Sequence, residues 1–184
     1  MVLILHEGKD DKKYLKRVCS YLDIEVNDDD FYEMGDKSSF FKEDSPAYEY
    51  IKKNPRVSKI LFVFDADYQS NDSKYGGYEN SEREIKLVIE NLELLNKSDY
   101  CITCNPNTKD GYFETLFFSC VPDDLKKCYE EFMKCSGFKE KENYKTIMTK
   151  LHEMASPSKP YNYEHPNFED IKTKLKNLFK EEKK

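Results

Sequence analysis

Three acidic residues stand just after two short apolar runs of the chain. Glu7 follows the run at residues 2–5, and Asp65 and Asp67 follow the run at residues 60–64. In an extended segment, side chains at positions i and i+2 project to the same side, so the two aspartates can point at one place. Carboxylates held close together repel each other unless a cation lies between them, and acidic, oxygen-rich sites suit Mg²⁺. The pattern predicts a site for Mg²⁺, or for Mn²⁺ as the alternative ion.

The elements that must position these acids alternate between strands and helices. Besides the two apolar runs, residues 31–34 and 100–103 are strand-like. Apolar residues at helical spacing predict helices at residues 10–22, 47–51, 81–95 and 112–120, the third beginning with Ser81 and Glu84 as a capping box. This alternation predicts an α/β fold with a doubly wound, mainly parallel four-stranded sheet in residues 1–120. Ligands of such sheets bind at the carboxyl ends of the strands.

Residues 121–184 show helical patterns alone, near residues 125–132, 144–154 and 168–179. We expect them to form a C-terminal helical extension packed on the same domain. Three roles stay open for this extension: binding the partner, shielding a face of the sheet, or forming the contact of a homodimer.

Each acidic motif also has a simpler interpretation. An Asp-x-Asp after a strand often serves only the turn, and a single Glu after a strand is often solvated. Their combination is more informative, since three acids end two strands of a fold that gathers ligands at that edge. The combination therefore favours a functional site.

The sequence around these acids resembles the Toprim domain, which is shared by type IA and II topoisomerases, bacterial primases, recombination-repair proteins and overcoming-lysogenization-defect nucleases. The resemblance rests on residues 6–11 (His-Glu-Gly-Lys-Asp-Asp) and 64–67 (Phe-Asp-Ala-Asp), which match a strand ending in Glu-Gly and a later strand ending in Asp-x-Asp. More closely, the chain resembles small stand-alone Toprim-like bacterial proteins of primase-like or uncharacterised function. In those proteins a glycine after the second strand (Gly35 here) and a late Gly-x-x-Glu (residues 111–114) recur. The resemblance covers residues 1–120.

The resemblance implies Mg²⁺-dependent chemistry on phosphodiester bonds of nucleic acid. It implies that Asp65 and Asp67 hold the metal and that Glu7 is a further ligand or the general acid/base. Glu114 would be a supplementary ligand, although a carboxylate at a helix start is also favoured by the helix dipole. Lys9 and Lys37 are candidate phosphate contacts. In a chain with so many lysines, solvated surface is the simpler interpretation of both.

Several functions stay open at this point. A nuclease-like enzyme is favoured over primase-like nucleotidyl transfer, because 184 residues leave little room for nucleotide and template surfaces. DNA is a more expected partner than RNA. One alternative is a non-catalytic module of DNA repair or replication that binds DNA or recruits a partner. A glycosyltransferase, in which Asp-x-Asp holds the metal of a nucleotide-sugar diphosphate, is the third class, but such domains are usually longer.

The distribution of charge restricts how a nucleic acid could bind. The chain carries 30 basic and 36 acidic residues, a net charge of −6. Residues 1–120 hold 16 basic and 24 acidic residues (−8), and residues 121–184 hold 14 and 12 (+2). The acidic part would repel a polyanion unless cations lay between them. Either the partner is not nucleic acid, or a divalent metal mediates the contact.

Six cysteines and the lack of long apolar segments suggest the compartment. Cys101 and Cys104 lie in a strand-like run, where positions i and i+3 point to opposite faces, and no second close pair follows. Reduced thiols are therefore favoured over disulfides or zinc. The apolar runs are strand-sized, and the first residues do not resemble a secretory signal. We expect a cytoplasmic protein that does not span the membrane.

Overall fold

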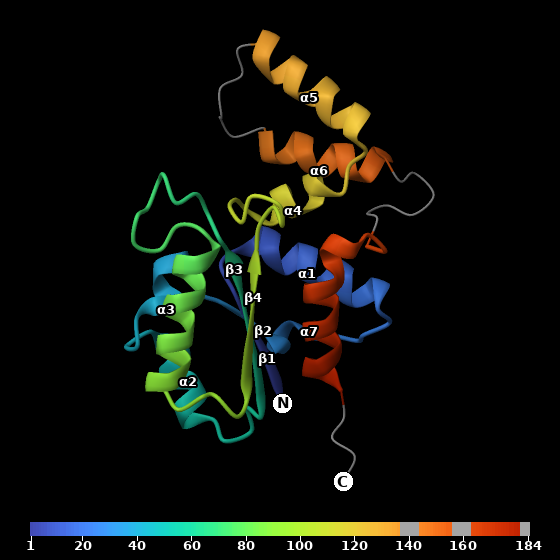
Figure 1. Ribbon diagram of the computed structural model, residues 1–184. Coiled ribbons are helices and arrows are strands. Elements are labelled where there is room, and N and C mark those ends of the chain that lie inside the picture. The colour runs from blue at the N-terminus through green and yellow to red at the C-terminus, as the bar shows by residue number, and fades with distance from the viewer. Residues whose placement is uncertain (137–143, 156–162, 181–184) are drawn as a thin grey trace.

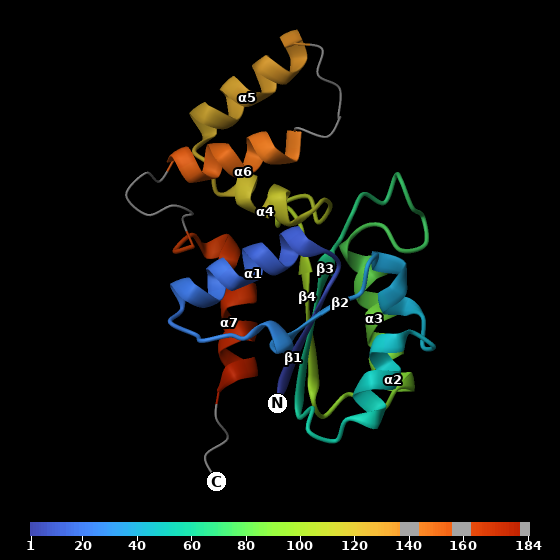
Figure 2. The same cartoon turned by 180° about the vertical axis from the view of Figure 1, so that it is seen from behind.

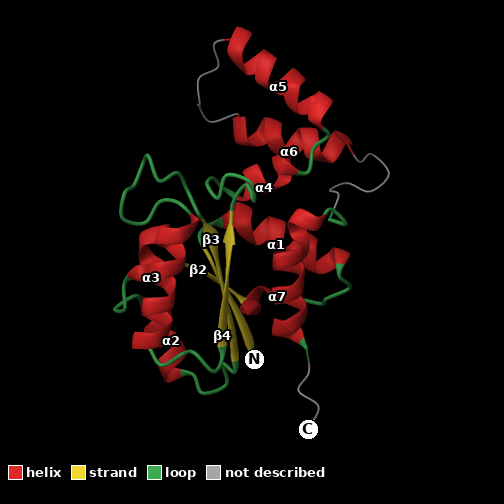
Figure 3. Ribbon diagram, viewed as in Figure 1, coloured by secondary structure: helices red, strands yellow, loops and turns green. Residues whose placement is uncertain are grey.

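The computed structural model describes residues 1–136, 144–155 and 163–180 (Figure 1). Its sheet consists of β1 Val2–His6, β2 Phe31–Glu33, β3 Lys59–Asp65 and β4 Ser98–Thr103. All neighbouring strands are parallel, in the order β2-β1-β3-β4. The strands, drawn in yellow, lie between two groups of helices (Figure 3). The four predicted strands and the doubly wound α/β fold are therefore confirmed. Since the chain runs outward from the centre in both directions, strand order reverses between β1 and β3.

Helices cover both faces of this sheet (Figures 1 and 2). On one face lie α2 Pro46–Lys53 and α3 Tyr78–Asn91, and on the other lie α1 Lys9–Tyr21 and α7 Glu169–Phe179. Alternate residues of β3 serve the two faces, as strand geometry requires. Phe62 and Phe64 pack in the core cluster beside α2 and α3, whereas Leu61 and Val63 pack in the cluster beside α1 and α7. The sheet is thus buried on both sides, which explains the uninterrupted apolar run.

The remaining helices lie beyond the carboxyl ends of the strands. They are α4 Phe113–Ser119, α5 Asp123–Ser136 and α6 Tyr144–Ala155. Figure 1 shows α4 directly above the sheet, α6 above α4, and α5 farthest from the strands. Three short 3₁₀ turns, η1 Asp28–Asp30, η2 Lys37–Phe41 and η3 Pro166–Phe168, complete the described elements. In the described parts of the chain, no helix is both long and apolar enough to cross a membrane.

Within residues 121–184, α7 contributes directly to the core of the sheet. Ile171, Leu175 and Leu178 are buried in the same cluster as Leu61 and Val63 of β3. By contrast, α5 has no buried residue. The last helix therefore belongs to the α/β core. Together with α1 from the beginning of the chain, α7 covers one face of the sheet.

The predicted start of the third helix was wrong. The helix α3 begins at Tyr78 after Gly77, whose φ of +82° is a conformation that favours glycine. Ser81 lies inside the helix, and its buried hydroxyl donates a hydrogen bond of 2.8 Å to the carbonyl oxygen of Tyr75. A serine can bond to nearby backbone from several positions, so the Ser-x-x-Glu spacing alone did not locate the cap. Leu95 follows the helix and is 65% exposed.

The cysteines follow the prediction from strand spacing. Cys101 belongs to the core cluster beside α1 and α7, and Cys104 belongs to the cluster on the opposite face. Both are buried, and all six cysteines are free thiols. Because Cys101 and Cys104 are buried in two separate core clusters, each is explained as a packing residue.

We predict that Leu175→Ala lowers the free energy of unfolding by about 2–5 kcal/mol, because it leaves a cavity where a fully buried side chain packs α7 on the sheet. Urea unfolding followed by circular dichroism measures this loss. Leu95→Ala, the same change at an exposed site, should alter the free energy by less than about 0.5 kcal/mol. Equal small effects in both variants would mean that α7 is not part of the core.

Candidate acidic site at the carboxyl ends of the strands

The two acids predicted to end neighbouring strands do meet. Glu7 follows β1, Asp65 is the last residue of β3, and these strands are paired at the point where strand order reverses. The backbone N–H of Asp65 donates a hydrogen bond of 2.7 Å to Oε1 of Glu7. This contact joins residues that are 58 positions apart and fixes the Glu7 side chain at the end of β3.

Asp65 is held by two further elements. Its Oδ1 accepts hydrogen bonds from the hydroxyl of Thr103 at 2.6 Å and from the backbone N–H of Phe113 at 2.9 Å. Thr103 ends β4 and Phe113 begins α4, so the carboxylate ties both to β3. The Asp65 side chain is 9% exposed, and no donor among the described residues contacts its Oδ2. One of its two oxygens is therefore used to hold the fold.

Asp67 is placed differently from the prediction. Its φ of +59° takes the chain out of the extended conformation, so the reasoning from i and i+2 positions does not apply. The backbones of Asp67 and Gly111 exchange two hydrogen bonds of 2.8 and 2.9 Å in an antiparallel bridge. The Asp67 carboxylate instead lies 3.4 Å from the ammonium of Lys37. The charge of Asp67 still contributes to the raised pKa of Glu7.

Lys37 is buried within the site, so its expected position on solvated surface was wrong. Its ammonium donates a hydrogen bond to the carbonyl oxygen of Ala66 and pairs with Asp67. Gly35, with φ of +90° and its N–H bonded to the Glu7 carbonyl oxygen, turns the chain after β2 so that η2 returns towards β3. Burial lowers the pKa of Lys37, while attraction to Asp67 opposes that change. The number of lysines in the sequence could not reveal that the chain after β2 turns back and buries Lys37.

Asp11 is a site residue that we did not select from the sequence. Its Oδ2 accepts a hydrogen bond of 2.8 Å from the backbone N–H of Gly8 in the first turn of α1. Burial raises the pKa of Asp11 to about 6, against the lowering effect of that hydrogen bond and with a further raise from Glu114. The signal was present in the sequence, because an acid at the third position of a helix commonly caps its start.

Glu114 lies on the first turn of α4 and is 7% exposed. One of its oxygens accepts a hydrogen bond of 3.3 Å from the hydroxyl of Tyr14, and the other lies 3.5 Å from the ammonium of Lys145. Both of its oxygens are thus engaged by side chains, unlike those of Asp65.

Lys145, on α6, is a second cation of the site and was not predicted. Burial lowers its pKa, but attraction to Glu114 and then Asp65 outweighs this effect, so the pKa of Lys145 is raised overall. Lys9, by contrast, is exposed at the start of α1, as the simpler interpretation of that residue expects.

The acids together concentrate negative charge at this edge of the sheet. Burial is the main cause that raises the pKa of Glu7 to about 7, the hydrogen bond from Asp65 opposes it, and the charges of Asp11 and Asp67 add to it. Burial and then the charge of Glu7 raise the pKa of Asp65 well above its usual range. Bringing a cation or donor to this place would relieve the repulsion.

The fit of a metal ion can be judged from the donors. In the described residues, no three His, Cys, Asp or Glu side chains already gather around one point as a metal site. The donor type is nevertheless suitable, since carboxylate oxygens are what Mg²⁺ prefers. Mg²⁺ commonly keeps several waters and takes only one or two carboxylates directly, completing its shell with substrate phosphate. Glu7 and Asp65 are two carboxylates of this site that would supply such direct contacts.

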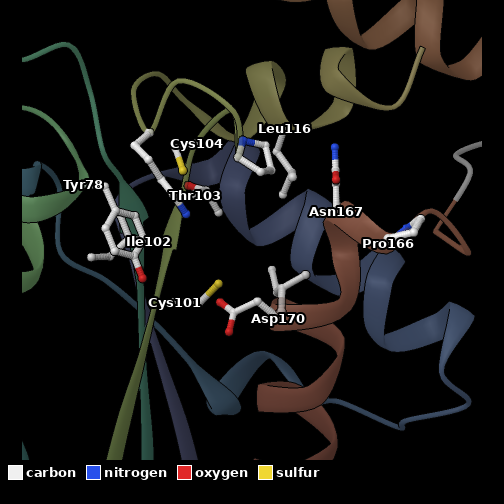
Figure 4. Close-up of a pocket in the computed structure, with 12 residues that line it drawn as sticks. Tyr78, Cys101, Ile102, Thr103, Cys104, Leu116, Pro166, Asn167 and Asp170 are labelled. Carbon is white, nitrogen blue, oxygen red and sulfur yellow. The ribbon is translucent and has the colours of Figure 1, made fainter. Parts of the chain in front are cut away.

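A cavity of about 360 Å³ lies beside these acids, along the edge strand β4 (Figure 4). Tyr78 and Ile102 line it on one side of the strand, and Cys101 and Asp170 line it on the other. Thr103 lines it as well and donates its hydroxyl to Asp65, so the cavity and the acidic site share one residue. None of the acids of the site lines this cavity.

Comparisons with known proteins leave the function to be inferred from this chemistry. No family model matches the chain, and neither a curated protein nor a solved structure is significantly similar to it. The Toprim resemblance therefore stays a prediction that rests on the residues themselves.

We predict that the repulsion at this site makes stability depend on pH through Glu7. The pKa of Glu7 is about 7 in the folded chain and 4.5 without the fold, so the native state holds the proton more tightly. Stability from this group is present below about pH 4.5, falls as the pH rises towards 7 and stays low above it. In EDTA, the free energy of unfolding should fall by up to about 3 kcal/mol more between pH 5 and pH 8 in the natural chain than in Glu7→Gln.

Urea unfolding at several pH values measures the difference. Glu130→Gln, at an exposed position of α5, is the matched control and should follow the natural chain. A pH dependence in Glu7→Gln equal to that of the natural chain would contradict the raised pKa of Glu7.

Proposed function

We propose that this protein is a metal-dependent enzyme that cleaves phosphodiester bonds of nucleic acid. The observation that carries this proposal is the hydrogen bond from the backbone N–H of Asp65 to the Glu7 carboxylate at the reversal of strand order. Ligands of doubly wound sheets bind at that point. The sequence resemblance to Toprim domains supports the same chemistry.

In this proposal Asp65 and Asp67 provide oxygens for Mg²⁺ or Mn²⁺, and Glu7 is either a further ligand or the general acid/base. When bound, the metal supplies positive charge that offsets the charge developing on the transferred phosphoryl group. Glu114 is a weaker candidate as a ligand than the sequence suggested, because Tyr14 and Lys145 already engage both of its oxygens. Its contacts favour the task of positioning the Lys145 ammonium.

The side chains of the site can divide the remaining tasks. As the general acid/base rather than a metal ligand, Glu7 would accept or return a proton near neutral pH, where such a group works best. Lys37 and Lys145 add positive charge on two sides of the carboxylates, which supports contact with phosphate. The acids otherwise repel a polyanion, so binding of nucleic acid would require the metal as well. The proposed substrate is DNA rather than RNA, and the proposed compartment is the cytoplasm.

A second candidate is a module that binds DNA or a partner without catalysis. The ion pair between Lys37 and Asp67 favours it, since an ammonium there can neutralise an aspartate that the enzymatic proposal assigns to the metal. The two candidates differ in whether a divalent metal is needed for cleavage of nucleic acid and raises the free energy of unfolding.

We predict that the purified protein cleaves single-stranded or double-stranded nucleic acid in the presence of Mg²⁺ or Mn²⁺ and not in EDTA. Asp65→Asn should reduce the rate about 100-fold or more, because it weakens the charge that holds the metal. Gel analysis of labelled DNA and RNA measures the products. Asp44→Asn, at an exposed position outside the site, is the matched control and should retain the rate. Products that form equally well in EDTA, or no product from any substrate, would contradict the enzymatic proposal.

We also predict that Mg²⁺ stabilises the folded protein. A concentration of Mg²⁺ 100-fold above its dissociation constant should add about 2.7 kcal/mol to the free energy of unfolding. Thermal unfolding with and without Mg²⁺ measures this gain. Asp65→Asn should be slightly more stable than the natural chain in EDTA, because it removes a buried negative charge, and should lose the gain. Unfolding that does not respond to millimolar Mg²⁺ would favour the non-catalytic candidate.

A further inference from the structure

A second cavity opens at the same end of the molecule and is walled by tyrosines. Tyr68, Tyr112 and Tyr144 line it together with Ser70 and Asn71, and its volume is about 340 Å³. The three rings come from the loop after β3, the residue before α4 and the first turn of α6. We call this feature the tyrosine cavity. Elements distant in the chain thus place aromatic side chains around one space.

The tyrosine cavity is joined to the acidic site by the backbone. Tyr68 follows Asp67 and Tyr112 follows Gly111, and Asp67 and Gly111 are the two residues that form the antiparallel bridge. The rings of Tyr68 and Tyr112 lie 5.4 Å apart between centroids, at 76° to each other. The bridge that places the Asp67 carboxylate therefore also places both rings beside it.

A cation connects the same two features. The ammonium of Lys145 lies 3.7 Å from the centroid of the Tyr112 ring and 3.5 Å from a carboxylate oxygen of Glu114. Lys145 can therefore offer positive charge to a phosphate at the border between the rings and the acids.

The three rings are not needed to build the hydrophobic core. Within the described residues, none of them belongs to either core cluster, and each is partly exposed. Elsewhere in the chain Tyr14 and Tyr48 are buried in those clusters. These side chains line an open cavity instead, with the Lys145 ammonium over one face of the Tyr112 ring.

We propose that the tyrosine cavity stacks unpaired bases of a single nucleic-acid strand and thereby presents a neighbouring phosphodiester to the acidic site. This inference rests on the proposed function and specifies its substrate as single-stranded. Aromatic rings stack any base, because every base has a π face, whereas the bases of a duplex are already stacked on one another. Lys145 then contacts the backbone of the bound strand, which is the usual partner of a cation beside stacking rings.

The experiment measures binding of labelled oligonucleotides by fluorescence anisotropy in millimolar Ca²⁺, with the oligonucleotide checked for integrity on a gel. Tyr68→Leu and Tyr112→Leu should each weaken binding of a single strand about 5- to 150-fold, as expected for the loss of one stacked base. Tyr68→Phe and Tyr112→Phe keep the rings and should bind nearly as well as the natural chain. Tyr50→Leu, on α2 and 40% exposed, is the control away from the cavity and should not change binding.

The choice of oligonucleotide separates stacking from attraction to phosphate. A strand without bases carries the same phosphates and should bind more weakly than the ordinary strand, and so should a duplex. DNA and RNA strands of equal sequence decide which sugar is preferred. Leucine variants that bind like the natural chain, or a base-free strand that binds as tightly as the ordinary one, would overturn the inference.

Two further comparisons keep the result interpretable. Thermal unfolding tests whether each leucine variant folds, and Tyr144→Leu on α6 provides a variant in a different element. Tyrosine-dependent binding without any metal-dependent cleavage would reject the proposed enzyme and retain the stacking cavity. Metal-dependent cleavage, together with binding that the tyrosine substitutions do not change, would retain the proposed enzyme and reject the stacking cavity.

Discussion

The site depends on backbone N–H groups that hold mutually repelling carboxylates in place. Asp65 donates its N–H to Glu7, Phe113 donates to Asp65, and Gly8 donates to Asp11. Hydrogen bonds from the main chain to a carboxylate favour its charged form, which burial and neighbouring acids disfavour. The two core clusters on either side of the sheet make the backbone rigid enough to sustain this opposition. The arrangement concentrates acidic side chains at the carboxyl ends of the strands.

Hydrogen bonds to the residues at the end of β3 also hold helix α4 over that strand. Its first N–H bonds to Asp65, and the preceding Gly111 bridges to Asp67. Gly111 has φ of +105°, and a side chain there would collide with Thr115, so glycine is required for this close approach. Through this junction one short segment places Tyr112 at the tyrosine cavity and Glu114 near Lys145. A single turn of the chain thus positions Tyr112 and Glu114.

Positive charge reaches the site from two directions. Lys37 arrives from the turn after β2 and Lys145 from α6, within a chain whose net charge is −6. Each lysine is paired with an acid, so neither turns the region into a basic surface. A nucleic acid would therefore be recognised by local contacts and added metal rather than by long-range attraction.

The sequence by itself determined the strands and the meeting of Glu7 with Asp65. Continuous apolar runs identify strands buried on both faces, and the carboxyl ends of parallel neighbours necessarily lie at one edge of the sheet. Only the tertiary structure decided the left-handed turn at Asp67, the burial of Lys37 and the approach of Lys145 and the three tyrosines. These features depend on contacts between segments far apart in the chain, and residue spacing carries no signal for them. Local periodicity reports which face of an element is buried, whereas the partner of a polar side chain is set by where the loops return.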